Sequence, residues 1–203
     1  MNTTVRTDRR RALRTLLQAT AASQLASPFV RLAEAQTLAP TPACGAPAAT
    51  TAEQTEGPYF KRSSPLRQSL MQDGLVGERL TLAGRVLDSR CQPVAKALLD
   101  FWQADGAGQY DNQTFRGRGH QFSDASGAFR LDTVVPGLYP GRTRHIHVKV
   151  QAAGGRVLTT QLYFPGEAGN RADGIFSPAL LMALRRETSG AQAGFDFVIG
   201  VPS

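Results

Sequence analysis

The alternation of apolar and polar residues along the chain predicts short β-strands separated by turns. In residues 145–151, the polar side chains of His145, His147 and Lys149 alternate with one isoleucine and two valines. Side chains two residues apart on a strand share a face, so both imidazoles project together while the apolar side chains face a core. Similar patterns bounded by turn residues predict further strands at 79–87, 95–102, 127–135, 157–164 and 195–201. We therefore predict an all-β fold, an antiparallel β-sandwich.

One stretch near the end of the chain has a helical pattern instead. Residues 178–187 place three leucines on one helical face, and Ser177 precedes them as a candidate N-cap. We predict one short C-terminal helix there. Two polar segments that contain glycine are predicted to be long loops, the usual place for functional residues on a β scaffold: 109–122 and 165–177.

The first 35 residues have the layout of an export signal. Arg9, Arg10 and Arg11 precede a mildly apolar stretch at 16–30, and Ala33-Glu34-Ala35 offers a small-x-small cleavage site. The paired arginines are typical of the twin-arginine type, so we expect a periplasmic or secreted protein. A basic amphipathic helix that stays attached is the alternative. The predicted organisation is a signal peptide at 1–35, an arm rich in Ala, Pro and Thr at 36–52 and a sandwich domain at 53–203.

Composition and charge narrow the function classes. The chain has 203 residues, 41% of them hydrophobic, which suits one domain with a sizeable core. No uninterrupted apolar run reaches 18 residues, so no membrane-spanning helix is expected. The net charge of +7 owes much to the first 35 residues, which hold six arginines and two acidic residues. The rest of the chain has no basic run that would indicate nucleic-acid binding. Formation of a homo-oligomer is left open.

Two cysteines, Cys44 and Cys91, are present. In an exported protein such a pair favours a disulfide. Closing a loop of about 48 residues would stabilise the fold by roughly 4 kcal/mol in the chain-entropy model. Two free thiols or an intermolecular bridge are the alternatives.

The His-x-His pattern is the first candidate for chemistry. Two imidazoles on one strand face can supply two metal ligands from a rigid element. The alternative is an edge strand whose polar side chains face water. Tyr139 and Arg142, just before the strand, favour the functional interpretation. The third histidine, His120, is expected to be exposed in a loop rich in glycine and arginine, or else to border the pocket.

Four short motifs occur in a fixed order along the chain. They are Glu56-Gly57-Pro58-Tyr59, a Phe-Trp-Gln-Ala segment with a glycine turn at 101–110, Pro-Gly-Leu-Tyr-Pro at 136–140 followed by His-x-His, and Thr-Gln-Leu-Tyr-Phe at 160–164. Each motif is weak alone. Together, over roughly residues 50 to 200, they resemble the intradiol ring-cleavage dioxygenase family.

The resemblance implies a non-haem Fe(III) cofactor. Tyr110 matches the tyrosinate that stays bound through turnover and Tyr139 the axial tyrosinate, while His145 matches the equatorial imidazole and His147 the axial one. The chemistry is consistent, because phenolates are hard donors for a hard cation. A nearby metal ion can deprotonate a phenol whose ordinary pKa is about 10. Read singly, Tyr110 could be a surface turn residue and Tyr139 the corner tyrosine of a sandwich.

The resemblance also implies a reaction. A catecholic substrate would react with O2 and open between its two hydroxyl-bearing carbons, giving a muconate-type diacid. Tyr139 would take up a proton as the substrate displaces it. Arg142 matches an arginine that steadies developing negative charge, Gln161 a glutamine near the metal, and Tyr59 a residue lining the pocket. The stretch from Tyr139 to His145 is shorter than in family members that act on protocatechuate. The resemblance therefore indicates the metal ligands more strongly than it indicates the substrate.

Two other classes of protein fit parts of the pattern. A non-catalytic transthyretin-like sandwich that binds aromatics or carbohydrates would keep the strands, but it would not need all four ligands. A zinc hydrolase is disfavoured because tyrosinates are unusual zinc ligands. Among the neighbouring aromatics, three are expected to serve packing: Trp102, Tyr163 and Phe164.

Overall fold

The computed structural model describes residues 44, 48–71 and 74–202, all within the compact unit Gln36–Ser203. The predicted export signal lies outside the described residues. In the described part, two short 3-10 turns, η1 (Ala168–Arg171) and η2 (Pro178–Leu180), are the only helical elements, and neither could cross a membrane. The strands are β1 (Arg79–Asp88), β2 (Leu98–Trp102), β3 (Arg118–Phe122), β4 (Ala128–Val134), β5 (His145–Gln151), β6 (Leu158–Tyr163), β7 (Ala183–Glu187), β8 (Gly190–Gly194) and β9 (Phe197–Ile199).

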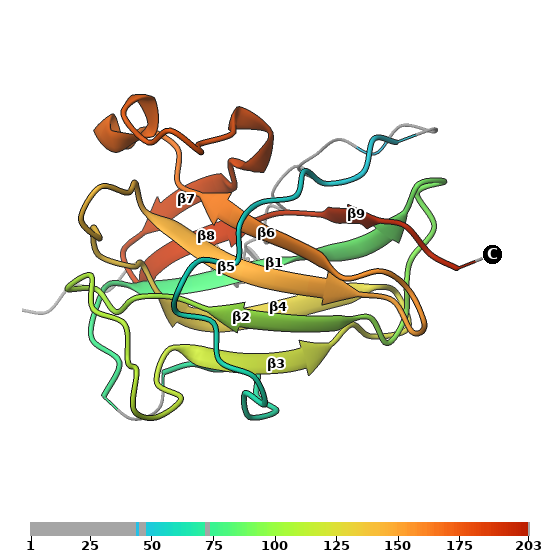
Figure 1. The fold of residues 1–203 in the computed structure, drawn as a ribbon, viewed down its shortest axis with the longest axis horizontal. Coiled ribbons are helices and arrows are strands. Elements are labelled where there is room, and N and C mark those ends of the chain that lie inside the picture. The colour runs from blue at the N-terminus through green and yellow to red at the C-terminus, as the bar shows by residue number, and fades with distance from the viewer. Residues whose placement is uncertain (1–43, 45–47, 72–73, 203) are drawn as a thin grey trace, which may run out of the picture. The chain divides into compact units, whose positions relative to one another are not determined.

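The strands form two sheets, one in front of the other (Figure 1). The first sheet has the order β3-β2-β5-β6 and is antiparallel throughout. The second has the order β4-β1-β8-β7, with β9 also paired to β1. The predicted all-β sandwich is confirmed, and each of the six predicted strands has a counterpart in the structure.

The second sheet departs from the predicted antiparallel arrangement, because β1 pairs in parallel with both β8 and β9. These two strands follow each other along one edge of β1, and Gly84 lies at their junction. A Cβ atom on Gly84 would lie 1.8 Å from the carbonyl oxygen of Phe195. The side chain of Asp196 fills the break in the ladder by accepting the N–H of Arg85 at 2.8 Å. Strand periodicity says nothing about the direction of the neighbouring strand, which explains the error.

The predicted helix at 178–187 is wrong. The segment contains one 3-10 turn, η2, and then strand β7. Leu180 is fully buried, and Leu181 forms an isolated bridge with Tyr163 of β6. Strand β7 then pairs along its length with β8. An isolated helix of ten residues is marginal in water, so this long-range backbone ladder outweighs the local pattern.

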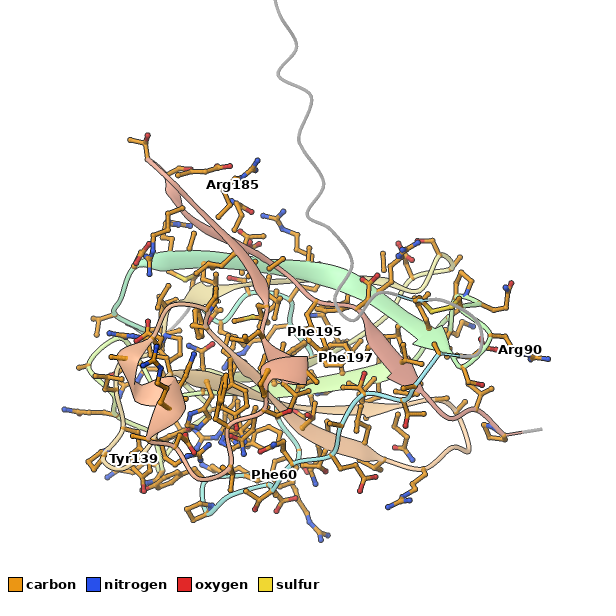
Figure 2. All side chains as sticks on the ribbon, turned by 90° about the horizontal axis from the view of Figure 1, so that it is seen from above. Phe60, Arg90, Tyr139, Arg185, Phe195 and Phe197 are labelled. Carbon is orange, nitrogen blue, oxygen red and sulfur yellow. A yellow bond between two sulfur atoms is a disulfide. The ribbon has the colours of Figure 1, made fainter. Side chains whose placement is uncertain are left out.

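The core lies between the two sheets. Leu82, Phe101, Leu131 and Val148 are fully buried members of it. Figure 2 shows Phe195 and Phe197 in the interior, whereas Arg90 and Arg185 lie at the periphery. Because side chains alternate along a strand, burying Phe101 and Val148 turns their neighbours Trp102 and His147 to the opposite face of the first sheet. The candidate site is built on that outer face.

The described part of the N-terminal arm is fixed to the sandwich. Cys44 and Cys91 form the expected internal disulfide, with Cα atoms 5.8 Å apart. Further along, the N–H of Thr51 donates to Val198 of β9 at 2.9 Å, and the N–H of Gln54 donates to Thr159 of β6 at 2.8 Å. The arm therefore leads directly to the outer face of β6.

Candidate metal centre

One row of residues crosses the outer face of the first sheet. In the strand register, Arg118 lies opposite Trp102, Trp102 opposite His147, and His147 opposite Gln161. Directly paired residues of an antiparallel sheet share a face, so these four side chains project together. His145 lies opposite Tyr163 in the next row. Strand pairing thus brings predicted site residues from β5 and β6 together with Trp102 and Arg118.

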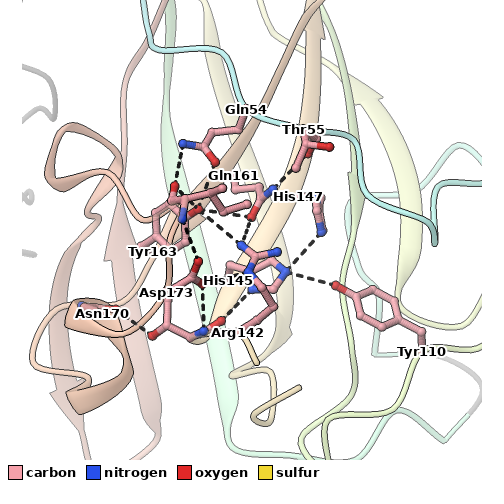
Figure 3. Close-up of polar contacts among 12 residues, drawn as sticks. Gln54, Thr55, Tyr110, Arg142, His145, His147, Gln161, Tyr163, Asn170 and Asp173 are labelled. Atoms are coloured by element: carbon pink, nitrogen blue, oxygen red, sulfur yellow. Dashed lines mark hydrogen bonds and ion pairs between the residues drawn. The ribbon is translucent and has the colours of Figure 1, made fainter. Parts of the chain in front are cut away.

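The two histidines converge. Their Nε2 atoms are 3.2 Å apart (Figure 3). Nδ1 of His145 lies 2.7 Å from the carbonyl oxygen of Thr143, which can only accept, so the proton sits on Nδ1 and Nε2 presents a lone pair. Two imidazole nitrogens bound at right angles to one metal ion, each at about 2.1 Å, stand roughly 3 Å apart. The observed spacing therefore suits chelation.

His147 is enclosed by the motifs around it. Its ring stacks on the indole of Trp102, with centroids 4.8 Å apart and planes at 8°. Trp102 is 1% exposed, which confirms its predicted packing role. On another side, a Cβ atom on Gly57 would lie 3.3 Å from Cε1 of His147. Within the described residues, the buried Nδ1 of His147 has no partner.

Burial sets the protonation state of both imidazoles. It lowers the pKa of His145 to about 4, and it lowers the pKa of His147 well below its ordinary value. In each case the cost of desolvating a cation exceeds any opposing interaction. Both rings are therefore neutral at physiological pH, which is the form that binds a metal.

Three of the predicted residues form one cluster of phenols. The hydroxyl of Tyr110 lies 3.4 Å from Nε2 of His145. The ring of Tyr59 stacks on that of Tyr110 at 4.3 Å, and Tyr139 meets Tyr110 edge-on at 6.1 Å. Among the described residues, the Tyr139 hydroxyl is bonded to that of Tyr59, at 3.1 Å, rather than to a histidine. Burial raises the pKa of Tyr110, so its ionisation would need a cation at the site.

Glycines hold the two tyrosine-bearing loops against each other. The N–H of Gly137 donates to the carbonyl of Asp105 at 2.7 Å. A Cβ atom on Gly137 would lie 2.2 Å from the backbone nitrogen of Gly108, and one on Gly108 would lie 2.1 Å from the carbonyl oxygen of Leu138. Such a close approach of two backbones is open only to glycine. The turns before Tyr110 and before Tyr139 are thus locked at a fixed separation.

Arg142 and Gln161, two of the predicted site residues, also lie together. Nη2 of Arg142 donates to Oε1 of Gln161 at 2.7 Å, and Nε2 of Gln161 donates to the carbonyl of Thr55 at 2.9 Å (Figure 3). Nε of Arg142 donates to Oδ2 of Asp173 at 2.8 Å. The guanidinium is therefore held from two sides and supplies a fixed positive charge beside the two histidines.

Two members of this network, Asp173 and Tyr163, were not predicted as site residues. Asp173 comes from the polar segment 165–177, but no spacing pattern links it to Arg142. Tyr163 is fully buried, as predicted, and its hydroxyl also lies 3.1 Å from Oε1 of Gln54 and 3.5 Å from Nη2 of Arg142. Burial raises the pKa of Tyr163 to about 12, so it acts as a neutral hydrogen-bonding group.

The prediction for His120 is wrong in its placement. His120 lies within β3 and not in an exposed loop, and it is half-buried. Its Nδ1 lies 2.7 Å from the carbonyl oxygen of Ser64. The sequence analysis did not predict strand β3 and placed its residues in a loop. The residues of β3 that face inward lack the large apolar side chains that mark most strands.

The donor set constrains which cation could bind. No group of three or more histidine, cysteine or carboxylate side chains occurs in the part of the chain that the structure describes. A metal ion at the histidine pair would therefore take its remaining protein ligands from phenols. Neutral imidazoles and phenolates together fit a hard trivalent cation better than zinc. The residues present fit Fe(III).

Fold and site together define a class of protein: a β-sandwich that carries a buried pair of neutral imidazoles beside a cluster of phenols, a donor set suited to a non-haem metal ion. A family described as Dioxygenase matches residues 55–199. The dioxygenase domain of a dioxygenase carbohydrate-binding protein fusion from Streptomyces sp. SirexAA-E is 56% identical, with a TM-score of 0.74, over 76% of this chain and 100% of that one. The chain belongs to the intradiol ring-cleavage dioxygenase family.

Other relatives carry the names of several enzymes. The protocatechuate 3,4-dioxygenase beta chain of Burkholderia cepacia is 38% identical over 120 residues, which are 50% of this chain and 51% of that protein. The structure of 3-chlorocatechol 1,2-dioxygenase from Rhodococcus opacus 1CP matches with a TM-score of 0.70 and 29% identity, over 75% of this chain and 73% of that one. The chain spans about half the length of the curated relatives it matches first.

Proposed function

We propose that this protein is an Fe(III)-dependent intradiol dioxygenase. It would cleave a catecholic ring with O2 between the two hydroxyl-bearing carbons and yield a muconate-type diacid. The observation that carries the proposal is the convergence of Nε2 of His145, Nε2 of His147 and the hydroxyl of Tyr110. The names of the relatives support the substrate class, since those proteins are called protocatechuate, hydroxyquinol and chlorocatechol dioxygenases.

The proposed iron ligands are Tyr110, Tyr139, His145 and His147. When bound, Fe(III) supplies Lewis acidity and makes a chelated catecholate reactive toward O2. The chain supplies neutral imidazoles through burial and fixes the His145 tautomer through the carbonyl of Thr143. Two phenolates and a hydroxide would balance the three charges of the cation.

Tyr139 has a second proposed role in proton transfer. As a phenolate released by an incoming catechol, it would accept a proton from a substrate hydroxyl. Its hydroxyl oxygen lies 3.1 Å from that of Tyr59, so a hydrogen-bond partner for the released side chain is already in place. The hydrogen bond to Tyr139 raises the pKa of Tyr59, which keeps Tyr59 in its neutral form. Tyr59 would thus line the pocket and orient Tyr139.

Arg142 would stabilise negative charge on the substrate. Its side chain is 19% exposed, and Asp173 and Gln161 hold it in one orientation. A charge that is oriented before the reaction costs little reorganisation when the oxyanionic intermediates form. Gln161 would act through Arg142 and through its place beside His147 in the strand register.

The test is a visible absorption spectrum with iron analysis, recorded before and after anaerobic addition of catechol. A broad tyrosinate-to-Fe(III) band that moves on addition is expected. Tyr110→Phe, Tyr139→Phe and His147→Ala should weaken the band or lower the iron content. Tyr163→Phe is the matched control, because it keeps the ring beside His145 and removes only a hydroxyl that is bonded to Gln54 and Arg142 rather than to a histidine. A protein that stays colourless after reconstitution with iron would contradict the proposal.

We also propose that the chain is exported by the twin-arginine route. The sequence pattern around Arg9 and Arg10 supports this, as does the Cys44–Cys91 disulfide, because disulfides are typical of oxidising compartments. Replacing Arg9 and Arg10 by lysines should leave the full-length precursor in the cytoplasm. Undiminished export of the double variant, measured by cell fractionation, would count against this route.

A further inference from the structure

Arg118 is a buried cation with an unusual set of partners. It begins β3 and is 1% exposed. Its guanidinium donates to three backbone carbonyls: that of Tyr59 at 2.9 Å, that of Arg116 at 3.3 Å and that of Asp111. In the described part of the chain its Nε has no partner, and the nearby Asp111 carboxylate attracts its charge without accepting a hydrogen bond from it. Burial lowers its pKa by penalising the charged form. An apolar side chain could fill this space without that penalty, so the charge calls for a functional explanation.

The carbonyls that Arg118 binds come from two segments of the proposed site. One is the carbonyl of Tyr59 itself, and another is that of Asp111, which directly follows Tyr110. The rings of Tyr59 and Tyr110 stack with planes at 13°. A planar guanidinium presents its donors in a fixed fork, so it holds two acceptors in one relative position. Arg118 therefore joins the backbones that carry the stacked pair.

The Tyr110 loop behaves as a unit that Arg118 attaches to the sheet. Within the loop, the carboxylate of Asp111 accepts the N–H groups of Gln113, Thr114 and Arg116, each at 2.9 Å. These bonds are internal to the loop and do not fix it to the strands. Lys61 and Arg67 attach the far part of the loop, by donating to the carbonyls of Thr114 and Phe115. Arg118 attaches the part next to Tyr110, because it lies opposite Trp102 in the strand register and Trp102 stacks on His147. The same row of the sheet thus supports His147 and the attachment of Tyr110.

We propose that Arg118 is a positioning residue that sets the place of the Tyr110 phenol relative to the two histidines. The metal-binding part of this inference rests on the proposed function, whereas the attachment of the loop does not. Without the guanidinium, the Tyr59 and Asp111 carbonyls lose their shared donor. Tyr110 then no longer keeps its hydroxyl 3.4 Å from His145.

The experiment compares Arg118→Gln and Arg118→Lys with wild type and with Arg116→Gln. Arg116→Gln is the matched control, since it also removes a positive charge from this loop but leaves the bonded carbonyl in place. Amide hydrogen exchange on the metal-free proteins is measured first. In Arg118→Gln, residues 57–61 and 109–116 should exchange about tenfold faster or more, with β5 unchanged. Arg118→Lys should have intermediate exchange rates, because one ammonium group cannot donate to two separated carbonyls as a planar guanidinium does.

The second measurement is the absorption band and iron affinity of the same four proteins. The inference predicts a displaced band and about tenfold weaker iron binding for Arg118→Gln, a smaller change in both for Arg118→Lys, and wild-type values for Arg116→Gln. Wild-type exchange and a wild-type band in Arg118→Gln would overturn it. Faster exchange spread evenly over β5 and the other strands would also overturn it, because that result indicates general destabilisation. If wild type itself shows no band, the proposed function fails, while hydrogen exchange still decides whether Arg118 attaches the loop.

Discussion

Arg142 donates from Nε to Oδ2 of Asp173 across 2.8 Å, although 31 residues separate them in the chain. The Asp173 side chain is only 2% exposed, and the same oxygen accepts the N–H of Thr143 at 3.0 Å. An arginine paired in this way keeps one orientation. We therefore expect Asp173 to influence the proposed reaction through the orientation of Arg142.

Replacing Asp173 tests this relationship. Asp173→Asn should lower kcat/KM for a catechol by about 10- to 100-fold, since a hydrogen bond to a charged group contributes roughly 1.5–3 kcal/mol. Iron content and the absorption band should stay as in wild type, because Asp173 is not a proposed ligand. Glu167→Gln is the control, as it breaks the half-buried neighbouring ion pair of Arg144 with Glu167 at 3.1 Å. Equal losses in both variants would contradict a specific role for Asp173.

The Arg142–Asp173 pair also predicts a dependence of stability on pH. Burial alone would raise the pKa of Asp173, but the Thr143 N–H and the Arg142 guanidinium outweigh it and lower the pKa. The native state then binds fewer protons than the unfolded state around the ordinary carboxyl pKa of about 3.9. The contribution to stability is complete above that value and is lost as the pH falls through the folded-state pKa. The difference in free energy of unfolding between wild type and Asp173→Asn should shrink below about pH 4.

Urea denaturation of the two metal-free proteins between pH 3 and pH 7 measures this difference. A gap between them that stays constant over the whole range would show that Asp173 stabilises the fold without its charge.

The close contact between Gly108 and Gly137 predicts that neither glycine can be replaced without separating the two loops that carry Tyr110 and Tyr139. Gly137→Ala would place a Cβ atom 2.2 Å from the Gly108 nitrogen, so the loops must separate. We expect a loss of about 1–3 kcal/mol in the free energy of unfolding, together with reduced iron binding. Gly200→Ala, where a Cβ atom would meet nothing within 4 Å, should leave both unchanged. Normal iron binding by Gly137→Ala would mean that loop separation does not control the site.

The Cys44–Cys91 disulfide is expected to stabilise both the fold and the segment that leads from the arm to the candidate site. Removing both cysteines, Cys44→Ser with Cys91→Ser, should lower the free energy of unfolding by about 4 kcal/mol in the chain-entropy model. The arm leads into the segment that supplies the Thr55 carbonyl contacted by Gln161, so hydrogen exchange at 48–55 should accelerate. Chemical reduction of the wild-type protein should reproduce both effects. An unchanged denaturation midpoint would show that the other arm contacts suffice.

The sequence by itself determined the sandwich and supplied most of the residues of the candidate site. Alternation predicted the bounds of β5, His145–Gln151, because one face of that strand packs into the hydrophobic core with apolar side chains while the other carries polar ones. It also placed His145 and His147 on one face. The order of four motifs added Tyr110, Tyr139, Arg142 and Gln161, and the structure brings their segments together.

Only the tertiary structure decided which segments pair and what holds the site residues in place. Strand β8, with the sequence Gly-Ala-Gln-Ala-Gly, lacks β-branched and aromatic residues, so its pairing with β1 and β7 left no local signal. The attachment of Arg142 to Asp173 and of Arg118 to Tyr59 joins residues 31 and 59 positions apart. A sequence pattern records which side chains prefer burial along one element. Contacts between distant elements depend on the three-dimensional arrangement, and here they orient the groups that the sequence had already identified.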